Sequence, residues 1–480
     1  PAKTFFAIIG MLLVVNLIIG ARKRDGRQEK FSQNIDSKDV EAVTQWIEKN
    51  AIPLESIAAG HGFKDLEPFG DILKDVRVVG LGEATHGSRE FFQFKHRMLE
   101  FLVEKLGFRI FAIEASYAGC NNINAYVLHG KGDPAEALAS QKFWTWDTQE
   151  VRDMIAWMRQ YNTKLPDEKK VQFLGYDLQH LEQGMDFVES YISQHIPEYS
   201  ETVSSAMKPL RIDPFSISEL PKASPEEKAR ILSELHEMMG ILAFHEVPLI
   251  RESSAEEYAL ALQNARVITQ YYTAYSKAMM GSDPAESAAA LRDFYMAENI
   301  EYIMNSERPD ARIVVWAHNG HISNSVWGMN FPAMGSHLKK ILGEAYYALG
   351  FAFNRGSFQA RLMDPESDQN GALIEFTVGP APEGSVEWFL AKSGIDNFII
   401  DLRRAPENGP IHHWLTSVHP LRFIGAAFSE KFGDKQFMVP TVLMDHFDGV
   451  AFFGRTSRAR PNPTGERGPY KQNMHPVKKN

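Results

Sequence analysis

The fold class is decided by one short stretch of the sequence, Val76-Arg-Val-Val-Gly-Leu-Gly82, which is followed at once by Glu83-Ala-Thr-His86-Gly87. An apolar run of this length with two glycines is typical of a buried strand that ends in a tight turn. The amphipathic residues from about Ser88 to Leu106 then predict a helix, and residues 109–114 predict a second strand. A strand, a helix and a strand in this order predict an α/β fold with a mostly parallel sheet and flanking helices.

Ionisable residues stand at the ends of several predicted strands. Glu83 and His86 follow the first strand, and Glu114 closes the second. Residues 171–177 predict a third strand that ends in an acid, and the stretch 312–321 predicts a fourth that is tipped by histidines. The carboxyl ends of parallel strands share one edge of a sheet, where ligands and catalytic groups gather. The sequence therefore predicts that one crevice brings together Glu83, His86, Glu114, Asp177, His318 and His321.

Two mechanisms suit this set of side chains. In the first, His86 takes a proton from water as general base, and Glu83 or Glu114 orients its ring. His318 and His321 then polarise a carbonyl or stabilise its oxyanion. In the second, zinc bound by His86, His318, His321 and a carboxylate supplies the attacking hydroxide. The first is favoured, because the familiar zinc motif spaces its histidines four apart on one helix face. No cofactor is therefore expected, with zinc as the alternative.

Aromatic and charged residues near the same strand ends are candidates for binding a substrate. Residues 143–146 include Trp144 and Trp146, which together with Tyr117 predict an apolar wall of the crevice. Lys95 lies two turns into the predicted helix. Helical side chains lean toward the N-terminus, so its ammonium could reach the crevice, and a solvated lysine is the alternative. Asp177 completes this candidate set.

Composition excludes several classes of function. The chain has 480 residues and a net charge of −10, and such a surface repels nucleic acid. Cys120 is the one cysteine, so an intrachain disulfide and a cysteine-built metal site are excluded, and a small buried hydrophobe is expected. The sequence has neither a phosphate-binding glycine loop nor a G-x-S-x-G elbow, so a serine hydrolase of the common α/β type is not expected.

The composition also divides the chain. Residues 1–21 are almost wholly apolar and predict an export signal or a single membrane anchor, with a buried helix of a cytoplasmic protein as the alternative. Residues 22–36 predict a polar linker, and residues 37–455 predict the hydrolytic domain. Residues 456–480 are basic and rich in Pro and Gly, and predict a disordered tail. Residues 224–306 predict a helical insert, which is a candidate lid over the sheet.

Several motifs, in order along the chain, resemble those of the erythromycin (macrolide) esterase family. The first is Gly82-Glu-Ala-Thr-His-Gly87, with Arg89-Glu-Phe-Phe and Ile113-Glu114 behind it. The later ones are Gly175-Tyr-Asp-Leu-Gln179, Arg292-Asp-Phe-Tyr-Met-Ala-Glu-Asn299 and Trp316-Ala-His-Asn-Gly-His321. The resemblance covers roughly residues 40 to 455. It implies a mostly parallel α/β core with a helical insert.

The resemblance also implies roles for particular residues. His86 matches the general base that activates water in the family, Glu83 and Glu114 match its acidic partners, and His318 and His321 match the second histidine pair. The family's arginine on the first helix is replaced here by Lys95. An ammonium does not offer the planar pair of donors that a guanidinium offers.

The expected function is hydrolysis of a carboxylic ester, most specifically a macrolide lactone, which would inactivate the antibiotic. The expected partner is a small-molecule ester, with no nucleic acid and with membrane attachment only through the N-terminal segment. Two alternatives remain. One is a hydrolase of another ester at the cell envelope, such as an acyl group on a surface glycan. The other is a non-catalytic envelope protein that binds a ligand in the same crevice.

Overall fold

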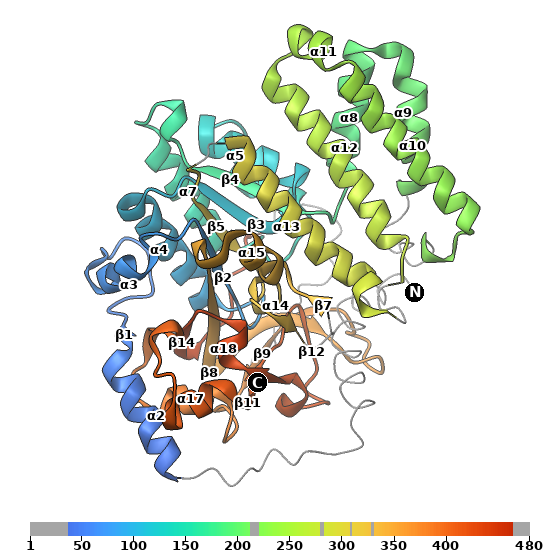
Figure 1. The fold of residues 1–480 in the computed structure, drawn as a ribbon. Helices are drawn as coiled ribbons and strands as arrows, with labels where there is room; N and C mark the ends of the chain where they lie inside the picture. Colours follow the sequence, from blue (N-terminus) through green and yellow to red (C-terminus); the bar gives the residue numbers. More distant parts are fainter. Residues whose placement is uncertain (1–36, 212–219, 279–282, 308–309, 328–330, 464–480) are drawn as a thin grey trace.

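The fold is built on one ten-stranded sheet with helices on both faces (Figure 1). The structure is a computed structural model that describes residues 37–211, 220–278, 283–307, 310–327 and 331–463. The strand order is β1-β10-β14-β8-β2-β5-β3-β4, and every neighbouring pair from β14 to β4 is parallel. These six strands are β2 (Val78–Leu81), β3 (Ile110–Ser116), β4 (Gln172–Asp177), β5 (Ile313–Trp316), β8 (Tyr346–Leu362) and β14 (Gly449–Thr456). The predicted α/β fold with a mostly parallel sheet is confirmed.

The remaining strands are antiparallel additions or short pairs. β1 (Ile52–Pro53), β10 (Asn397–Asp401) and β9 (Leu373–Val378) pair antiparallel within the main sheet, and β12 (Ala427–Phe428) pairs parallel with β8. Two separate antiparallel pairs join β11 (Val418–Arg422) to β13 (Met438–Val442) and β6 (Val326–Trp327) to β7 (Phe331–Pro332).

Each face of the sheet is covered by its own buried cluster. Neighbouring strand residues point to opposite faces, so Val78 belongs to one cluster and Val79 to the other. The helix α4 (Arg89–Leu106) buries four phenylalanines in the second cluster and ends at Gly107, whose φ of +74° suits glycine. The other helices around the sheet are α2 (Ser37–Asn50), α3 (Glu67–Leu73), α5 (Asn121–His129), α6 (Pro134–Ser140), α7 (Gln149–Asn162), α14 (Asn319–Ile322), α15 (Met334–Leu342), α16 (Val386–Lys392), α17 (Gly409–Thr416) and α18 (Leu443–His446).

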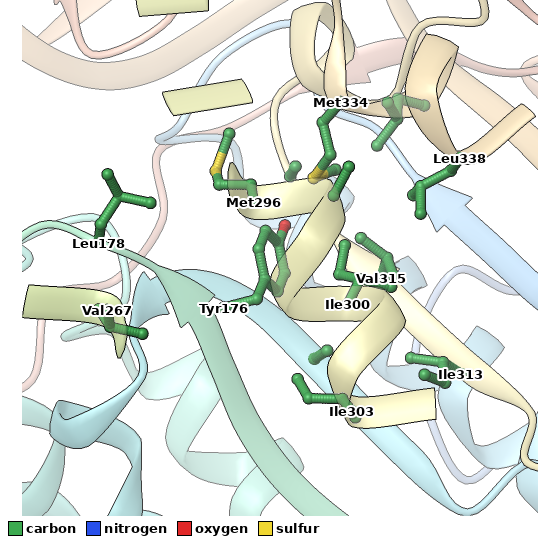
Figure 2. Packing of buried hydrophobic residues seen from close by; sticks show 14 of the residues in the cluster. Tyr176, Leu178, Val267, Met296, Ile300, Ile303, Ile313, Val315, Met334 and Leu338 are labelled. Atoms are coloured by element: carbon green, nitrogen blue, oxygen red, sulfur yellow. The ribbon is translucent and has the colours of Figure 1, made fainter. Parts of the chain in front are cut away.

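The predicted insert is helical, and its last helix returns to the sheet. Its helices α10 (Pro225–Phe244), α11 (Glu246–Glu252) and α12 (Ala255–Tyr275) lie together with the preceding α8 (Glu182–His195) and α9 (Ser200–Met207) at one corner of the molecule (Figure 1). The helix α13 (Ala288–Glu307) then packs against β4 and α15. Figure 2 shows Met296 and Ile300 of α13 in the same buried cluster as Ile313 and Val315 of β5. The lid role remains a prediction.

The expectation of a disordered tail from residue 456 is wrong for its first part. Ser457 donates to both carboxylate oxygens of Glu90 at 2.6 Å, and the Arg460 Nε donates to Glu150 at 2.7 Å. In return, the carbonyls of Ser457 and Arg460 accept from the first residues of α4 and α7. This segment, residues 457–463, therefore satisfies backbone donors that a helix N-terminus cannot pair internally. Composition alone missed these contacts, because their partners lie more than 300 residues away in the chain.

We expect residues 457–463 to be needed for stability. A chain that stops after Thr456 should lose at least about 3 kcal/mol of unfolding free energy, because hydrogen bonds to charged groups contribute about 1.5–3 kcal/mol each. A chain that stops after Pro463 is the matched control and should change by less than about 0.5 kcal/mol. Urea unfolding of the two truncated chains checks this, and equal midpoints would contradict it.

Two terminal predictions lie outside the described residues. These are the signal or anchor at residues 1–21 and the linker at 22–36; residues 464–480 of the predicted tail also fall there. Within the described ranges, no helix combines the length and the apolar character that crossing a membrane requires.

Candidate active site

The strand order brings the ionisable strand ends together. The strand β5 lies between β2 and β3, and β4 pairs with the far side of β3, so four carboxyl ends are adjacent. The His86 Nδ1 lies 2.6 Å from Glu83, and the rings of His86 and His318 are 5.1 Å apart between centroids. The His321 Nε2 lies 3.3 Å from a Glu114 oxygen. The predicted meeting of these residues at one point is therefore confirmed.

Two glycines allow the backbone to approach closely around His86. A Cβ on Gly82 would lie 2.2 Å from the Asn319 side-chain oxygen, and a Cβ on Gly87 would lie 2.0 Å from the Gln359 carbonyl. Neither contact is possible for a larger residue without movement of the neighbouring segments. The turn that carries Glu83 and His86 is thereby held against β8 and the turn after β5.

Glu83 is fully buried and has three side-chain partners. Its Oε1 lies 2.6 Å from the His86 Nδ1, and its Oε2 accepts from the Lys95 Nζ at 2.7 Å and from the Trp316 Nε1 at 2.9 Å. Glu83 thus fixes the His86 ring through Nδ1, which leaves Nε2 to act as a base. The His86 side chain is 13% exposed.

Lys95 does not have the position expected of a substrate-binding residue. Its side chain is fully buried, and its Nζ lies over the Trp316 ring at 4.2 Å. Burial lowers the pKa of Lys95 to about 8, although the Glu83 carboxylate opposes that shift. The ammonium is therefore charged at neutral pH and pairs with the Glu83 oxygen that does not contact His86. Both the exposed and the substrate-contacting interpretations of Lys95 are wrong.

We expect Lys95→Met to destabilise the protein by about 3–5 kcal/mol, because one partner of a buried ion pair is left uncompensated. Lys95→Arg keeps the charge and should lose about 1–3 kcal/mol from overpacking. Lys105→Met, at an exposed site in the last turn of α4, is the control and should cost less than about 1 kcal/mol. Urea unfolding at pH 7 measures all three, and equal losses for the two methionine variants would contradict the buried pair.

The second half of the site is built around Glu114. The Arg292 Nη2 donates to Glu114 Oε1 and to Asp177 Oδ2, each at 2.8 Å. The His318 backbone N–H donates to the other Glu114 oxygen at 3.1 Å. The His321 Nδ1 lies 2.8 Å from Asp293. Among the described residues, the carboxylates of Glu83, Glu114, Asp177 and Asp293 therefore face Lys95, Arg292 and His321 at this end of the sheet.

The pKa values of Glu114, His318 and His321 are shifted in different directions. Burial alone would raise the pKa of Glu114, but the charges of His321 and Arg292 outweigh burial and hold it well below its usual value. Burial and the neighbouring His86 and His321 hold the pKa of His318 well below its usual value, so its ring is neutral. Asp293 and Glu114 outweigh burial at His321 and raise its pKa to about 10. The pKa values of His318 and His321 are thus shifted in opposite directions.

Two residues expected to bind substrate have structural positions instead. Trp146 is 1% exposed, donates its Nε1 to the Glu114 carbonyl at 3.1 Å, and meets the His86 ring edge-on at 6.0 Å. Asp177 is fully buried and paired with Arg292. Neither side chain is free to contact a substrate. Trp144 and Tyr117 are half-buried, and their roles remain predictions.

Arg292 and Asp293 were not predicted as site residues, although between them they contact Glu114, Asp177 and His321. Both come from the first turns of α13, far from the strand ends in sequence. The sequence feature that could have identified them is the adjacent charged pair Arg292-Asp293, which lies within one of the motifs shared with the family. Only the packing of α13 against β4 brings these side chains to the site.

The zinc alternative requires free ring nitrogens on three histidines that converge on one point. In this geometry both nitrogens of His321 face carboxylates, and the His86 Nδ1 faces Glu83. Among the residues that the structure describes, no three His, Cys, Asp or Glu side chains are grouped so that they could hold a metal ion. This geometry concerns zinc only, and the expectation that the reaction needs no cofactor remains a prediction.

The comparisons with known proteins agree with this architecture. The chain is 26% identical over 382 residues to erythromycin esterase type II of Escherichia coli, covering 76% of this chain and 90% of that protein. It is similar to a solved Bacillus cereus protein, with 26% identity, a TM-score of 0.76, and coverage of 88% and 99% of the two chains. A solved protein named as a succinoglycan biosynthesis protein also has 26% identity, with a TM-score of 0.75 and coverage of 90% and 100%.

The family model described as erythromycin esterase matches residues 103–456. That range includes Glu114, Arg292, Asp293 and the two histidines after β5, while Glu83 and His86 precede it. The match spans well over half of the chain, and this protein belongs to the erythromycin esterase family.

Proposed function

We propose that this protein hydrolyses carboxylic esters, with His86 as the general base that activates water. The observation that carries the proposal is the Glu83–His86 pair at 2.6 Å, which occupies the Nδ1 of a ring that lies 5.1 Å from the His318 ring. Membership of the erythromycin esterase family supports an ester as the substrate class.

The proposed reaction has two proton transfers. The His86 Nε2 takes a proton from water as the water oxygen bonds to the ester carbonyl carbon, and the carbonyl π pair becomes an oxyanion. The charge of His321 stabilises that oxyanion, and the neutral His318 ring lies beside it. The tetrahedral intermediate then breaks its bond to the alcohol oxygen, which receives the proton from His86 and leaves. For a cyclic ester, one ring-opened hydroxy acid is formed.

We propose a macrolide lactone as the most specific substrate, because a relative that covers most of this chain is named an erythromycin esterase. Mass spectrometry of erythromycin after incubation with the purified protein tests this. The expected result is an ion heavier by one water molecule that does not form without protein. Unchanged erythromycin at high protein concentration would overturn the macrolide assignment.

A second candidate substrate is an acyl ester on an envelope polysaccharide. The relative named for succinoglycan biosynthesis favours it. The test is release of acetate or succinate from acylated polysaccharide, measured beside erythromycin and p-nitrophenyl esters. If none of these is hydrolysed, yet a ligand raises the melting temperature, the protein is a binding protein and the esterase proposal fails.

A further inference from the structure

We propose that Asp293 is a positioning residue of this site, which holds the His321 ring in the orientation and charge that the reacting carbonyl requires. The inference rests on the proposed ester hydrolysis and deepens it. It adds a second acid–histidine pair to the Glu83–His86 pair. The two pairs would have opposite tasks, since one accepts a proton and the other supplies a fixed positive charge.

The His321 ring lies between two carboxylates, those of Asp293 and Glu114. Both Asp293 oxygens lie close to the His321 Nδ1, at 2.8 and 3.0 Å, and Glu114 Oε1 lies 3.3 Å from the Nε2. Asp293 and Glu114 are 3% and 7% exposed, so water screens these contacts little. A ring that donates from both nitrogens is held in one orientation, whereas a neutral ring can donate from one only.

His318, three residues earlier, provides the contrast. Its Nδ1 accepts from the Gly320 N–H at 3.2 Å, and its side chain meets no carboxylate oxygen within hydrogen-bond distance among the described residues. Its Nε2 makes no hydrogen bond of good geometry there either, although the Ala84 carbonyl lies close enough to act on the pKa of the ring. The two histidines are therefore distinguished by their acid partners.

A third contact of the His321 ring also depends on its protonation state. The Arg292 Nη1 lies 3.2 Å from the His321 Nε2. It could donate to that nitrogen only if the ring were neutral. Asp293 and Glu114 outweigh burial and raise the pKa of His321 to about 10, so we place the Nε2 proton toward Glu114. Nitrogen NMR distinguishes this state from a neutral ring that accepts from Arg292. The other titratable or charged groups around this pair are Glu114 on β3, His318 before α14, Tyr275 on α12 and His337 on α15.

Asp293 also has a structural contact, which the experiment must separate from its effect on His321. Its Oδ2 accepts from the Met334 N–H at 2.9 Å, at the start of α15. Asp293→Asn keeps an amide oxygen for Met334 but removes the negative charge. Asp293→Ala removes both. Glu301→Gln, which neutralises an acid further along α13, is the matched control because no ion pair or hydrogen bond links Glu301 to the site in the described structure.

The sign of the pH effect follows from the raised pKa. A histidine whose folded pKa lies above its ordinary value of 6.5 contributes stability that is fully present below that value and is lost as the pH rises through about 10. The charge that would serve catalysis disappears over the same upper range. In Asp293→Asn we expect the alkaline fall in the hydrolysis rate to move toward neutral pH.

Two measurements test the proposal. Long-range proton–nitrogen NMR at pH 8, assigned with a His321→Gln variant, should show both ring nitrogens of His321 protonated in the wild type and in Glu301→Gln, but a neutral ring in Asp293→Asn. In the same Asp293→Asn variant, kcat for an ester should fall at pH 8 by about a hundredfold, of the order found for one lost oxyanion donor, with KM little changed.

A His321 ring that stays cationic in Asp293→Asn would overturn the proposal. So would a loss of rate that is equal at every pH and accompanied by the same drop in melting temperature as in Asp293→Ala, because that is a structural role. If the wild type hydrolyses no ester, the proposed function fails while the NMR result still decides whether Asp293 sets the charge of His321.

Discussion

His86→Ala should lower kcat for ester hydrolysis between about a hundredfold and ten-thousandfold, because it removes the general base. Its effect on folding should be small, since Glu83 keeps its bonds to Lys95 and Trp316. The measurement is the rate of ester hydrolysis at pH 7 to 8, together with the melting temperature of each variant.

His236→Ala, at an exposed position on α10, is the matched histidine control and should leave the rate unchanged. Dialysis of the wild type against a chelator should also leave the rate unchanged in the favoured mechanism. Activity that is lost to the chelator and restored by zinc would reverse the choice between the two mechanisms. A His86→Ala variant as active as the wild type would remove His86 from catalysis.

Arg292→Met should lower the unfolding free energy by about 3–5 kcal/mol. Arg292 is 12% exposed and is the shared partner of Glu114 and Asp177, so its loss leaves two buried carboxylates without their main cation. The variant should also lose activity, because Glu114 holds the His318 backbone and the His321 ring.

Arg211→Met is the matched control for this prediction. Arg211 also bridges two carboxylates, those of Asp186 at 2.9 Å and Glu189 at 2.6 Å, but all three side chains are partly exposed. Its loss should cost less than about 1 kcal/mol, because solvent screens exposed pairs. Urea unfolding measures both variants, and similar losses would contradict the strength assigned to the buried cluster.

The effect of Arg292→Met should depend on pH. A carboxyl group whose pKa is depressed in the folded state contributes stability above its ordinary value, 4.5 for Glu114, and this stability is lost as the pH falls through the lower folded value. Removing Arg292 takes away part of that depression. The difference from the wild type should therefore be large at pH 7 and should shrink below about pH 4.5.

The regular elements were largely predictable from local pattern. The glycine-bounded apolar run at β2, the amphipathic spacing of α4 and the acid at the end of β4 each report on a few neighbouring residues. The strand β8 extends from Tyr346 to Leu362, well beyond its apolar first half. Its second half pairs with β9, and that partner is distant in sequence and not visible in a local pattern.

The site itself was predicted in part. The residues at strand ends were found because a parallel sheet collects its carboxyl ends on one edge whatever the order of its strands. Burial was not predictable in the same way. Trp146 was expected to line the crevice and Lys95 to bind substrate, but both are buried. Trp146 packs against Trp316 and donates to the Glu114 carbonyl, and Lys95 lies over the Trp316 ring.

The sequence by itself determined the α/β class and which residue types stand at the strand ends, since both follow from the alternation of apolar and polar residues along short segments. Only the tertiary structure decided that β5 lies between β2 and β3, that Arg292 and Asp293 reach the site from α13, and that Lys95 serves Glu83 from within the core. The physical reason is that strand neighbours, burial and ion pairing are set by contacts between distant segments. A charged side chain acquires its role from the partner it meets there, and local spacing does not name that partner.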